Sequence, residues 1–480
     1  MAEPAAKTRA DAPALSDPDR KSKDETDPAS ASDLDDGEVD AVNEKALIRK
    51  IDWRLLPAVG ILYLLSFLDR SNVGNARIEG LADDLHMTGN QYLTGLTLYF
   101  IGYVLFEIPC NIILKRTTPR FWLPTLTILW GIVATLMGIV RNLTGFFVAR
   151  FFLGVTESGL FPGVVYYFSM WYQRRERQFR ISLFFGAAAL AGSFGGILAY
   201  EGIATVVVAV GAYWFIYNYP ETAEFLSDKE RRFIRRRLAA DSDATHDETF
   251  TWGNVAKALR DPKCWLYGLS FHTMSLPLYT FSLFLPTIIK DLGYKAANAQ
   301  LLTIPPYAFA FITTIGVATL SERIGHRALP LIGSALFAII GYIILLSNSD
   351  PTSRPGVSYL GTFFAAGGIY PATALALSWP AINVSGQTKR AVANAMQISI
   401  GNLGAVLGTQ LYRSTDGPRY FVGHGFALGY LVGEVVVSSI LYFLLKRENR
   451  RREAITPEVK EVGDLVDWSG DDDPRWRFQY

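Results

Sequence analysis

The sequence predicts an all-α, polytopic membrane protein with twelve transmembrane helices in two six-helix halves. Three observations support this fold class. Half of the 480 residues are hydrophobic and form runs of about 20, each able to cross a hydrocarbon core of roughly 30 Å. Basic residues concentrate after every second run, and the longest internal loop separates six runs from six. In chain order the runs cover residues 53–74, 91–114, 121–140, 143–171, 180–200, 202–219, 264–289, 300–320, 328–347, 357–379, 391–412 and 424–446.

The chain begins with a polar, acidic segment, residues 1–46, rich in Asp, Ser, Pro and Ala and without aromatic residues. A segment of this composition cannot bury enough apolar surface to fold. We expect a disordered cytoplasmic tail here.

The first half, residues 47–219, holds six runs whose flanking loops alternate in charge. Loops after the even-numbered runs are rich in Lys and Arg, while the other loops carry only scattered basic residues. The densest clusters are Arg174, Arg175, Arg177 and Arg180 after the fourth run, and Arg231, Arg232, Arg235, Arg236 and Arg237 after the sixth. Because such loops stay on the cytoplasmic side, the pattern places both termini in the cytoplasm.

The junction between the fifth and sixth runs lacks a polar loop. From residue 181 to residue 219 the only charged side chain is Glu201. Two helices need a connection, usually of about 2–8 residues. Either Gly195-Gly196 or Glu201-Gly202 supplies a very tight turn, or the chain lacks a segment here. We predict the latter, through an error in the gene model or in splicing.

Residues 220–262 form a cytoplasmic loop between the halves, and 228–232 within it favour a solvated helix. The second half covers residues 263–446. It echoes the first: basic turns precede Leu123-Pro124 and Leu329-Pro330 at corresponding places. Duplicated six-helix halves around a central site are a known transporter plan. Residues 447–480 predict a second cytoplasmic tail, whose aromatic end the sequence does not explain.

Two pairs of charged residues stand out inside the apolar runs: Asp69 with Arg70, and Arg150 with Glu157. A charge at bilayer depth costs roughly 2.5–3.5 kcal/mol on insertion scales, so it normally faces a bundle interior or a wet cavity. Seven residues rise roughly 10 Å along a helix, which puts Arg150, Gly154 and Glu157 on one face. We therefore predict a buried charged site. The alternative is a salt-bridge network that only holds the fourth helix in place.

Two buried arginines suit an anion, because each offers a planar fork for a carboxylate and stays charged. An anion that competes for the arginine raises the proton affinity of the nearby carboxyl, so proton and anion binding are linked. Arg70 and Arg150 are thus the predicted substrate-binding residues, with Glu157 and Asp69 carrying the proton. Polar residues in other spans are secondary candidates for substrate contact, with helix–helix hydrogen bonding as the alternative; they are Tyr103, His272, Asn394 and Asn402.

Other classes of function lack support in the sequence. The two cysteines, Cys110 and Cys264, lie in apolar runs, and the five histidines show no ligand spacing. No nucleophile–base pair is visible. We predict no enzyme activity, no metal, no cofactor and no nucleic-acid partner, and a monomer in the lipid bilayer.

Three stretches carry a family resemblance: Phe67–Ala76, Arg150–Gly163 and Trp171–Arg177. With them, residues 45–446 resemble the major facilitator superfamily and, more narrowly, the anion:cation symporter family. The most similar branch is the fungal allantoate permease group, with its nicotinate, pantothenate, biotin and ureide carriers. The resemblance implies Arg70 and Arg150 at the substrate anion and Glu157, or else Asp69, as the proton carrier. It also implies a plasma-membrane location.

The sequence also departs from that family. The Gly and Asp expected within Asn111–Arg120 are absent, as is the outer loop between the fifth and sixth spans. Our leading hypothesis is a proton-coupled symporter of a small organic anion, working by rocking of the two halves. A facilitator or exchanger is the alternative within transport. A nontransporting nutrient sensor that signals through its tails is the alternative from another class.

Overall fold

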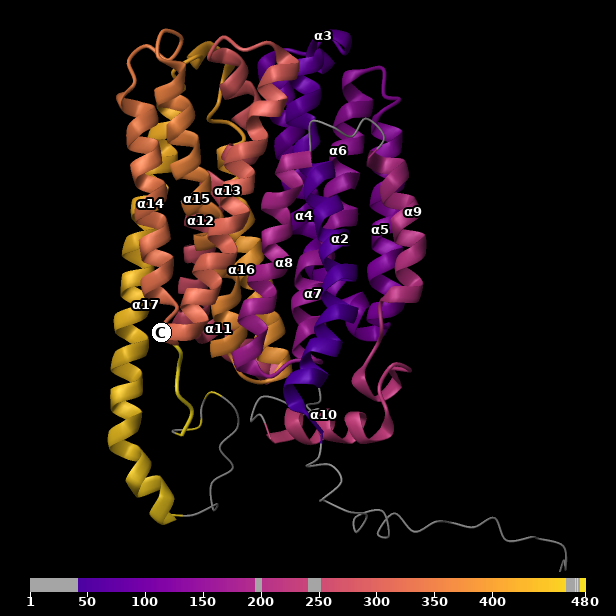
Figure 1. Ribbon diagram of the computed structural model, residues 1–480, viewed down its shortest axis with the longest axis vertical. Helices are drawn as coiled ribbons and strands as arrows, with labels where there is room; N and C mark the ends of the chain where they lie inside the picture. Colours follow the sequence, from indigo (N-terminus) through magenta and orange to yellow (C-terminus); the bar gives the residue numbers. More distant parts are fainter. Residues whose placement is uncertain (1–41, 195–200, 241–251, 463–470, 472, 474) are drawn as a thin grey trace, which may run out of the picture.

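The computed structural model describes residues 42–194, 201–240, 252–462, 471, 473 and 475–480, and over these residues the secondary structure is helical without strands. Figure 1 shows the long helices standing side by side. Nine of the described helical spans are long and apolar enough to cross a membrane, and α8, α9 and α12 complete the predicted twelve. The all-helical, multi-pass fold predicted from the sequence is confirmed.

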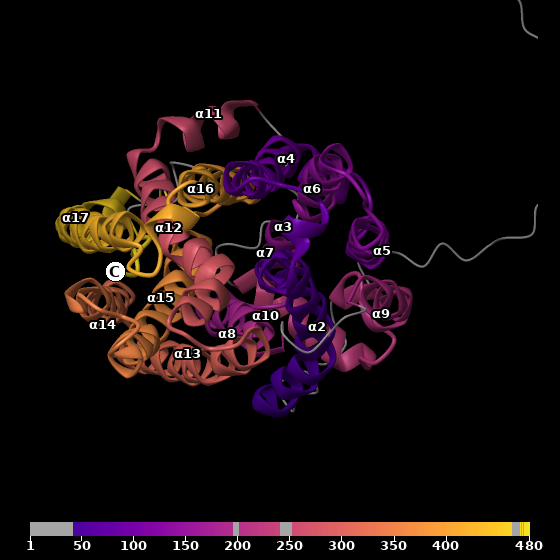
Figure 2. The same ribbon diagram turned by 90° about the horizontal axis from the view of Figure 1, so that it is seen from above.

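The first-half helices are α2 (Glu44–Glu79), α4 (Gly89–Arg116), α5 (Pro119–Met137), α6 (Leu143–Glu157), α7 (Leu160–Ser169), α8 (Arg174–Phe194) and α9 (Glu201–Phe215). The second-half helices are α12 (Pro262–Asp291), α13 (Ala296–Ile324), α14 (Ala328–Ser347), α15 (Pro355–Asn383), α16 (Gln387–Gly408) and α17 (Phe421–Val462). Figure 2, seen along the helices, shows the two groups on opposite sides, with α4 beside α16. Each predicted run overlaps one of these helices, except that the fourth is divided between α6 and α7.

Local sequence explains where several helices begin. Thr88 and Gln91 form a capping box at the start of α4, and Asn142 accepts a hydrogen bond from Gly145 at the start of α6. The fourth span breaks between Glu157 and Leu160, just before Pro162. A proline ring clashes with the carbonyl four residues earlier, here that of Ser158, so the proline is accommodated in the first turn of a new helix, α7.

The short helices lie at the ends of the bundle. They are α3 (Leu81–Asp84), α10 (Asp228–Ala240), α11 (Trp252–Arg260) and the 3₁₀ turns Pro220–Thr222 and Ser414–Asp416. We call the end that carries α10 the α10 face; α2 starts there and α17 ends there (Figure 1). Helix α10 covers the predicted solvated helix, and ion pairs of Lys50 with Glu230 and of Arg237 with Glu176 hold it against the first half.

The C-terminal region differs from the expected solvated tail over 447–480. Helix α17 continues to Val462, and the last residues fold back onto the α10 face. Trp476 and Phe478 are only 6% and 3% exposed. Asn449 exchanges two hydrogen bonds of 2.8 Å with the backbone of Phe478, and Asn383 accepts one of 2.8 Å from the backbone of Gln479. Two buried aromatic side chains and a satisfied backbone stabilise this segment, which composition alone did not reveal.

The two halves are in contact at both ends of the bundle. At the α10 face, Gln178 donates to Ser321 at 3.0 Å, and Arg174 donates to the carbonyl oxygen of Ile382. At the opposite face, the hydroxyls of Thr97 and Thr409 lie 2.7 Å apart. The two halves therefore touch at each end of the space between them. Residues 1–41 and the 195–200 junction, where the sequence predicts a tail and a missing loop, lie outside the described residues.

Candidate functional site

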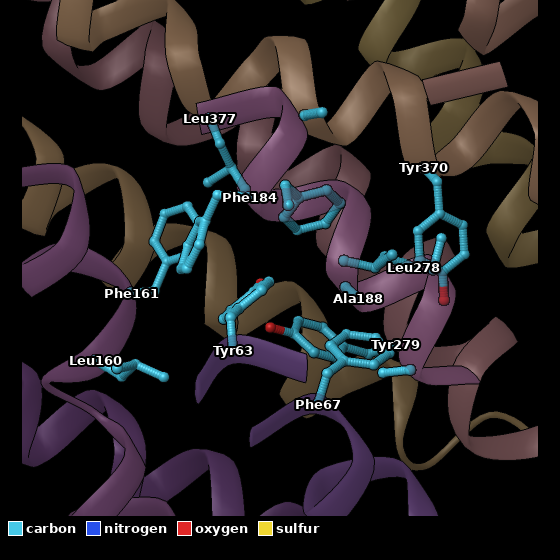
Figure 3. Close-up of a cluster of buried hydrophobic side chains, with 14 of the residues drawn as sticks. Tyr63, Phe67, Leu160, Phe161, Phe184, Ala188, Leu278, Tyr279, Tyr370 and Leu377 are labelled. Atoms are coloured by element: carbon cyan, nitrogen blue, oxygen red, sulfur yellow. The ribbon is translucent and has the colours of Figure 1, made fainter. Parts of the chain in front are cut away.

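A small cavity with about 10 Å³ of free space lies between the halves at mid-depth. Both halves contribute to it, mainly with aromatic side chains. Figure 3 shows Tyr63 of α2 next to Tyr279 of α12 within this aromatic cluster. The lining residues of this central cavity are Tyr63, Arg70, Tyr103, Phe161, Phe185, Phe271, Tyr279, Leu377, Ile398 and Asn402.

Arg70 connects the two halves within the cavity. Its Nη2 and Nε donate to Oε2 of Glu157 at 2.9 and 3.3 Å, and its Nη1 donates to the hydroxyl of Tyr279 at 2.7 Å. The guanidinium lies 5.2 Å from the ring centroid of Tyr99 and 5.3 Å from that of Tyr103. An arginine packed against aromatic faces keeps its charge in a dry environment and still presents a hydrogen-bonding fork.

Glu157 is the last residue of α6 and is fully buried. Its Oε2 accepts from Arg70, from the hydroxyl of Tyr99 at 2.7 Å and from the hydroxyl of Ser66 at 3.2 Å. Its Oε1 has no hydrogen-bond partner among the described residues. One oxygen is thus saturated with donors, while the other retains its capacity to take a proton or a ligand hydrogen bond.

Arg150 lies two turns before Glu157 on α6 and is 1% exposed. Its Nε and Nη1 have no hydrogen-bond partner within the described part of the chain, and its guanidinium carbon lies 5.8 Å from the ring centroid of Tyr99. A buried donor without a hydrogen-bond acceptor lowers the stability of the protein by about 1–3 kcal/mol. Such an arrangement is expected where an anion supplies the missing acceptors.

Close contact of α4 and α6 brings these groups together. A Cβ atom on Gly154, midway between Arg150 and Glu157, would overlap the backbone carbonyl oxygen of Tyr99. The absence of a side chain at this position permits the close approach of the backbone of α4. It lets Tyr99 touch both charged residues of α6.

Asp69 does not join this group. Its Oδ2 accepts from the indole of Trp130 at 3.1 Å and from the hydroxyl of Thr205 at 3.2 Å, so it faces α5 and α9 within the first half. Successive helical residues point about 100° apart, which separates Asp69 from Arg70. The site therefore contains both predicted arginines but only one of the two predicted carboxylates, that of Glu157.

The secondary candidates divide into two groups. Tyr103 and Asn402 line the central cavity. His272 instead bonds the carbonyl oxygen of Ile400 at 2.9 Å and the hydroxyl of Tyr430 at 3.3 Å, which is the helix–helix alternative. Asn394 lies at a second cavity, with about 40 Å³ of free space, near the α10 face between α4, α7 and α16; we call it the vestibule. The vestibule is lined by Asn111, Leu114, Pro162, Val165, Tyr166, Ser169, Arg390, Ala391 and Asn394.

Tyr99 and Ser66 are the site residues that our sequence reasoning missed. Each lies four residues before a residue that it identified: Ser66 before Arg70, and Tyr99 before Tyr103. Side chains four apart share a helix face, so this spacing was the available signal.

A bundle of two helix groups closed around a buried charged cavity is the architecture of a membrane transporter. Residues 59–409 match the Major Facilitator Superfamily. The chain belongs to this superfamily and is a multi-pass membrane transporter of its type.

Curated relatives agree over most of the chain. The MFS-type transporter cnsO of Penicillium expansum is 34% identical, over 91% of this chain and 90% of the relative. The high-affinity nicotinic acid transporter of Saccharomyces cerevisiae is 30% identical, over 91% of this chain and 85% of the relative. The cnsO alignment is 469 positions long, whereas 91% of this 480-residue chain is only about 437 residues. The aligned part of the relative therefore contains residues without a counterpart in this chain.

Solved structures share the fold. The E. coli fucose:proton symporter FucP has a TM-score of 0.58 at 13% identity, over 81% of this chain and 99% of that one. A bacterial homologue of the human lysosomal transporter Spinster, in an inward-facing and unoccupied conformation, has a TM-score of 0.58 at 15% identity, over 81% of this chain and 95% of that one.

Proposed function

We propose that this chain is a proton-coupled symporter of a small organic anion, in the anion:cation symporter branch of the superfamily. The observation that carries the proposal is that two buried arginines lie near only one carboxylate, that of Glu157. Arg70 is hydrogen-bonded to Glu157, while Arg150 has two nitrogens without partners among the described residues. One carboxylate substrate supplies the missing acceptors and offsets the excess positive charge.

The walls of the central cavity narrow the substrate class. They are mainly aromatic, for example Tyr63 and Tyr279, and suit a compact or planar molecule. In this conformation the cavity has only about 10 Å³ of free space, roughly one water molecule, so the substrate enters when the halves move apart. A monocarboxylate on a small ring, such as nicotinate, fits such walls, and a relative at 30% identity is named for nicotinic acid transport. Ureides such as allantoate are the second group to test.

Glu157 couples the anion to a proton. In the structure its Oε2 is held by Arg70 and Tyr99. A substrate carboxylate that takes over Arg70 removes the cation from Glu157, whose carboxyl then binds a proton. By reciprocal linkage, the proton increases the affinity for the anion by the same factor. The carrier with both ligands bound, and the empty carrier, then change between the outward-open and inward-open conformations more readily than a carrier with only one ligand.

Alternating access follows from the two sets of contacts between the halves. Breaking the Thr97–Thr409 contact opens the face opposite α10, and breaking the Gln178–Ser321 contact opens the α10 face. The clusters of basic residues at the α10 face support it as the cytoplasmic side, with both termini inside. The proposal includes a monomer in the plasma membrane.

The test is uptake of radiolabelled nicotinate and a panel of small carboxylates and ureides into proteoliposomes, with and without an inward proton gradient. Arg70→Ala and Arg150→Ala should each weaken binding by about 2–5 kcal/mol, which is roughly 30-fold or more in affinity. Arg→Lys should restore little, because an ammonium does not reproduce the fork. Glu157→Gln should abolish accumulation driven by the pH gradient and retain counterflow.

Three outcomes contradict the proposal. Uptake that does not depend on the proton gradient would identify the protein as a facilitator or exchanger. Accumulation that survives Glu157→Gln but not Asp69→Asn moves the proton to Asp69. Binding without uptake of any panel member assigns a sensor.

A further inference from the structure

Helix α4 carries a row of polar side chains along one face. Tyr99, Tyr103, Glu107 and Asn111 follow one another at intervals of four residues, and together they rise about 18 Å. Tyr99 donates to Glu157, and Tyr103 lines the central cavity. Asn111 lines the vestibule near the α10 face. The row therefore runs from the proton-coupling carboxylate to the proposed cytoplasmic side.

Glu107 is the one titratable carboxylic acid in this row and is fully buried. Its Oε2 accepts from the hydroxyl of Ser399 on α16 at 3.1 Å, and its Oε1 has no hydrogen-bond partner in the described part of the chain. The titratable groups that face it are Tyr103 and Cys110 on α4 and Tyr279 on α12. None of these is a cation, and no ion pair to Glu107 forms among the described residues.

The hydrogen-bond partner of Glu107 lies on α16. Asn402 and Ile398 of this helix line the central cavity, while Asn394 and Arg390 line the vestibule. Ser399 directly follows Ile398 and so lies at the level of the central cavity, and α4 and α16 lie side by side (Figure 2). The Glu107–Ser399 hydrogen bond thus crosses the seam between the halves, and on α4 the position of Glu107 falls between a residue of the central cavity and a residue of the vestibule.

We propose that Glu107 is a second proton-binding carboxyl of the transport cycle, which receives the coupling proton from Glu157 and releases it into the vestibule. The inference rests on the proton-coupled symport proposed above. A buried carboxyl without a cation is stable in its neutral form, since burial of an unpaired carboxylate is costly. When the α10 face opens, the Glu107–Ser399 bond breaks and water reaches the carboxyl.

The proton balance is then complete. Glu107 loses its proton to water in the vestibule and becomes a carboxylate. The proton on Glu157 is transferred to that carboxylate along the side of α4 that carries Tyr99, which donates to Glu157 at 2.7 Å, and Tyr103. Glu157 then returns to its ion pair with Arg70.

The decisive variant is Glu107→Gln, which keeps the size and the acceptor for Ser399 but cannot release a proton. In proteoliposomes with radiolabelled nicotinate as the probe, accumulation driven by a proton gradient should fall roughly 100-fold, the lower end of what a positioned proton-transfer group contributes. Counterflow, which needs no net proton release, should persist. Glu107→Asp keeps a titratable group and should restore accumulation in part.

The chain offers a matched control in Glu434 of α17, another fully buried carboxyl. It accepts from Ser270 at 2.8 Å and from Thr273 and Ser438 at 2.5 Å, all within the second half and away from both cavities. Glu434→Gln should leave the ratio of accumulation to counterflow unchanged. Ser399→Ala removes the hydrogen bond but not the carboxyl, and it should also preserve coupling.

The outcomes separate the two proposals. Wild-type protein that does not respond to the proton gradient refutes proton symport itself. Wild-type protein that responds, together with a Glu107→Gln variant that accumulates normally, refutes only the role of Glu107. A loss of coupling in Ser399→Ala as large as in Glu107→Gln, or a loss of counterflow in both, assigns the contact a structural role and overturns the inference.

Discussion

Replacing each buried arginine by methionine should change stability in opposite directions. Methionine has a similar length but no charge, so Arg70→Met and Arg150→Met remove the guanidinium and keep most of the volume. Arg70 has three hydrogen bonds, two to Glu157 and one to Tyr279. Arg150 has two nitrogens without a partner in the described part of the chain and one aromatic contact, with Tyr99.

The magnitudes follow from these contacts. At Arg150, two unmade donors cost about 1–3 kcal/mol each, and the contact with Tyr99 gives back about 0.5–2 kcal/mol. Arg150→Met should therefore stabilise the substrate-free protein by about 3 kcal/mol, the middle of a range of about 0–5 kcal/mol. Arg70→Met leaves Glu157 buried without its cation and should destabilise by about 3–5 kcal/mol. Both variants should lose nicotinate uptake.

The assay is thermal unfolding in one detergent at one pH, followed by tryptophan fluorescence, with and without nicotinate. Wild-type protein should be stabilised by nicotinate through mass action, and Arg150→Met should start from a higher transition temperature and lose that response. If both variants are equally destabilised, Arg150 already has an acceptor in the substrate-free protein. The argument for an anion site from its unpaired nitrogens would then be refuted.

Further predictions concern the packing, the C-terminal segment, the topology and the junction. Gly154→Ala should cost about 1–3 kcal/mol by overpacking α6 against α4 and should impair uptake, whereas Gly211→Ala, whose added Cβ meets nothing within 4 Å, should leave both uptake and melting temperature unchanged. Trp476→Ala should lower stability by about 3–5 kcal/mol as measured by thermal unfolding, and an unchanged transition would show that the segment does not pack on the α10 face in solution. Lys229→Cys, exposed on α10, should react with an impermeant thiol reagent only from the inside; labelling of intact cells would reverse the topology. Sequencing of the transcript across residues 195–200 should reveal a longer form, and a matching transcript whose product transports normally would exclude a missing segment.

The sequence was sufficient to predict the helical multi-pass fold because the membrane restricts which backbone structures can cross it. Apolar runs of the right length must be helices, since backbone groups cannot remain unpaired in lipid. The same rule made charged residues inside the runs conspicuous, and Arg70, Arg150 and Glu157 were found in this way. Their i, i+7 relation on α6 follows from helix geometry alone.

Contacts between helices were decided only by the tertiary structure. Asp69 and Arg70 are neighbours in sequence, yet one faces α5 and α9 and the other faces α6 and α12. No sequence pattern distinguishes these directions, because both sides of α2 are covered by other helices. For the same reason the sequence predicted His272 and Asn394 as residues of the central cavity. In the structure His272 is hydrogen-bonded to α16 and α17, and Asn394 lines the vestibule.

The sequence by itself thus determined that the chain spans a membrane many times and holds buried charges of both signs, because hydrophobic length and the cost of burying charge are local properties. Only the tertiary structure decided which charges pair, that Tyr99 joins both charged residues of α6, and that the aromatic end of the chain packs on the α10 face. These outcomes depend on which helix faces meet, and that is a property of the whole bundle.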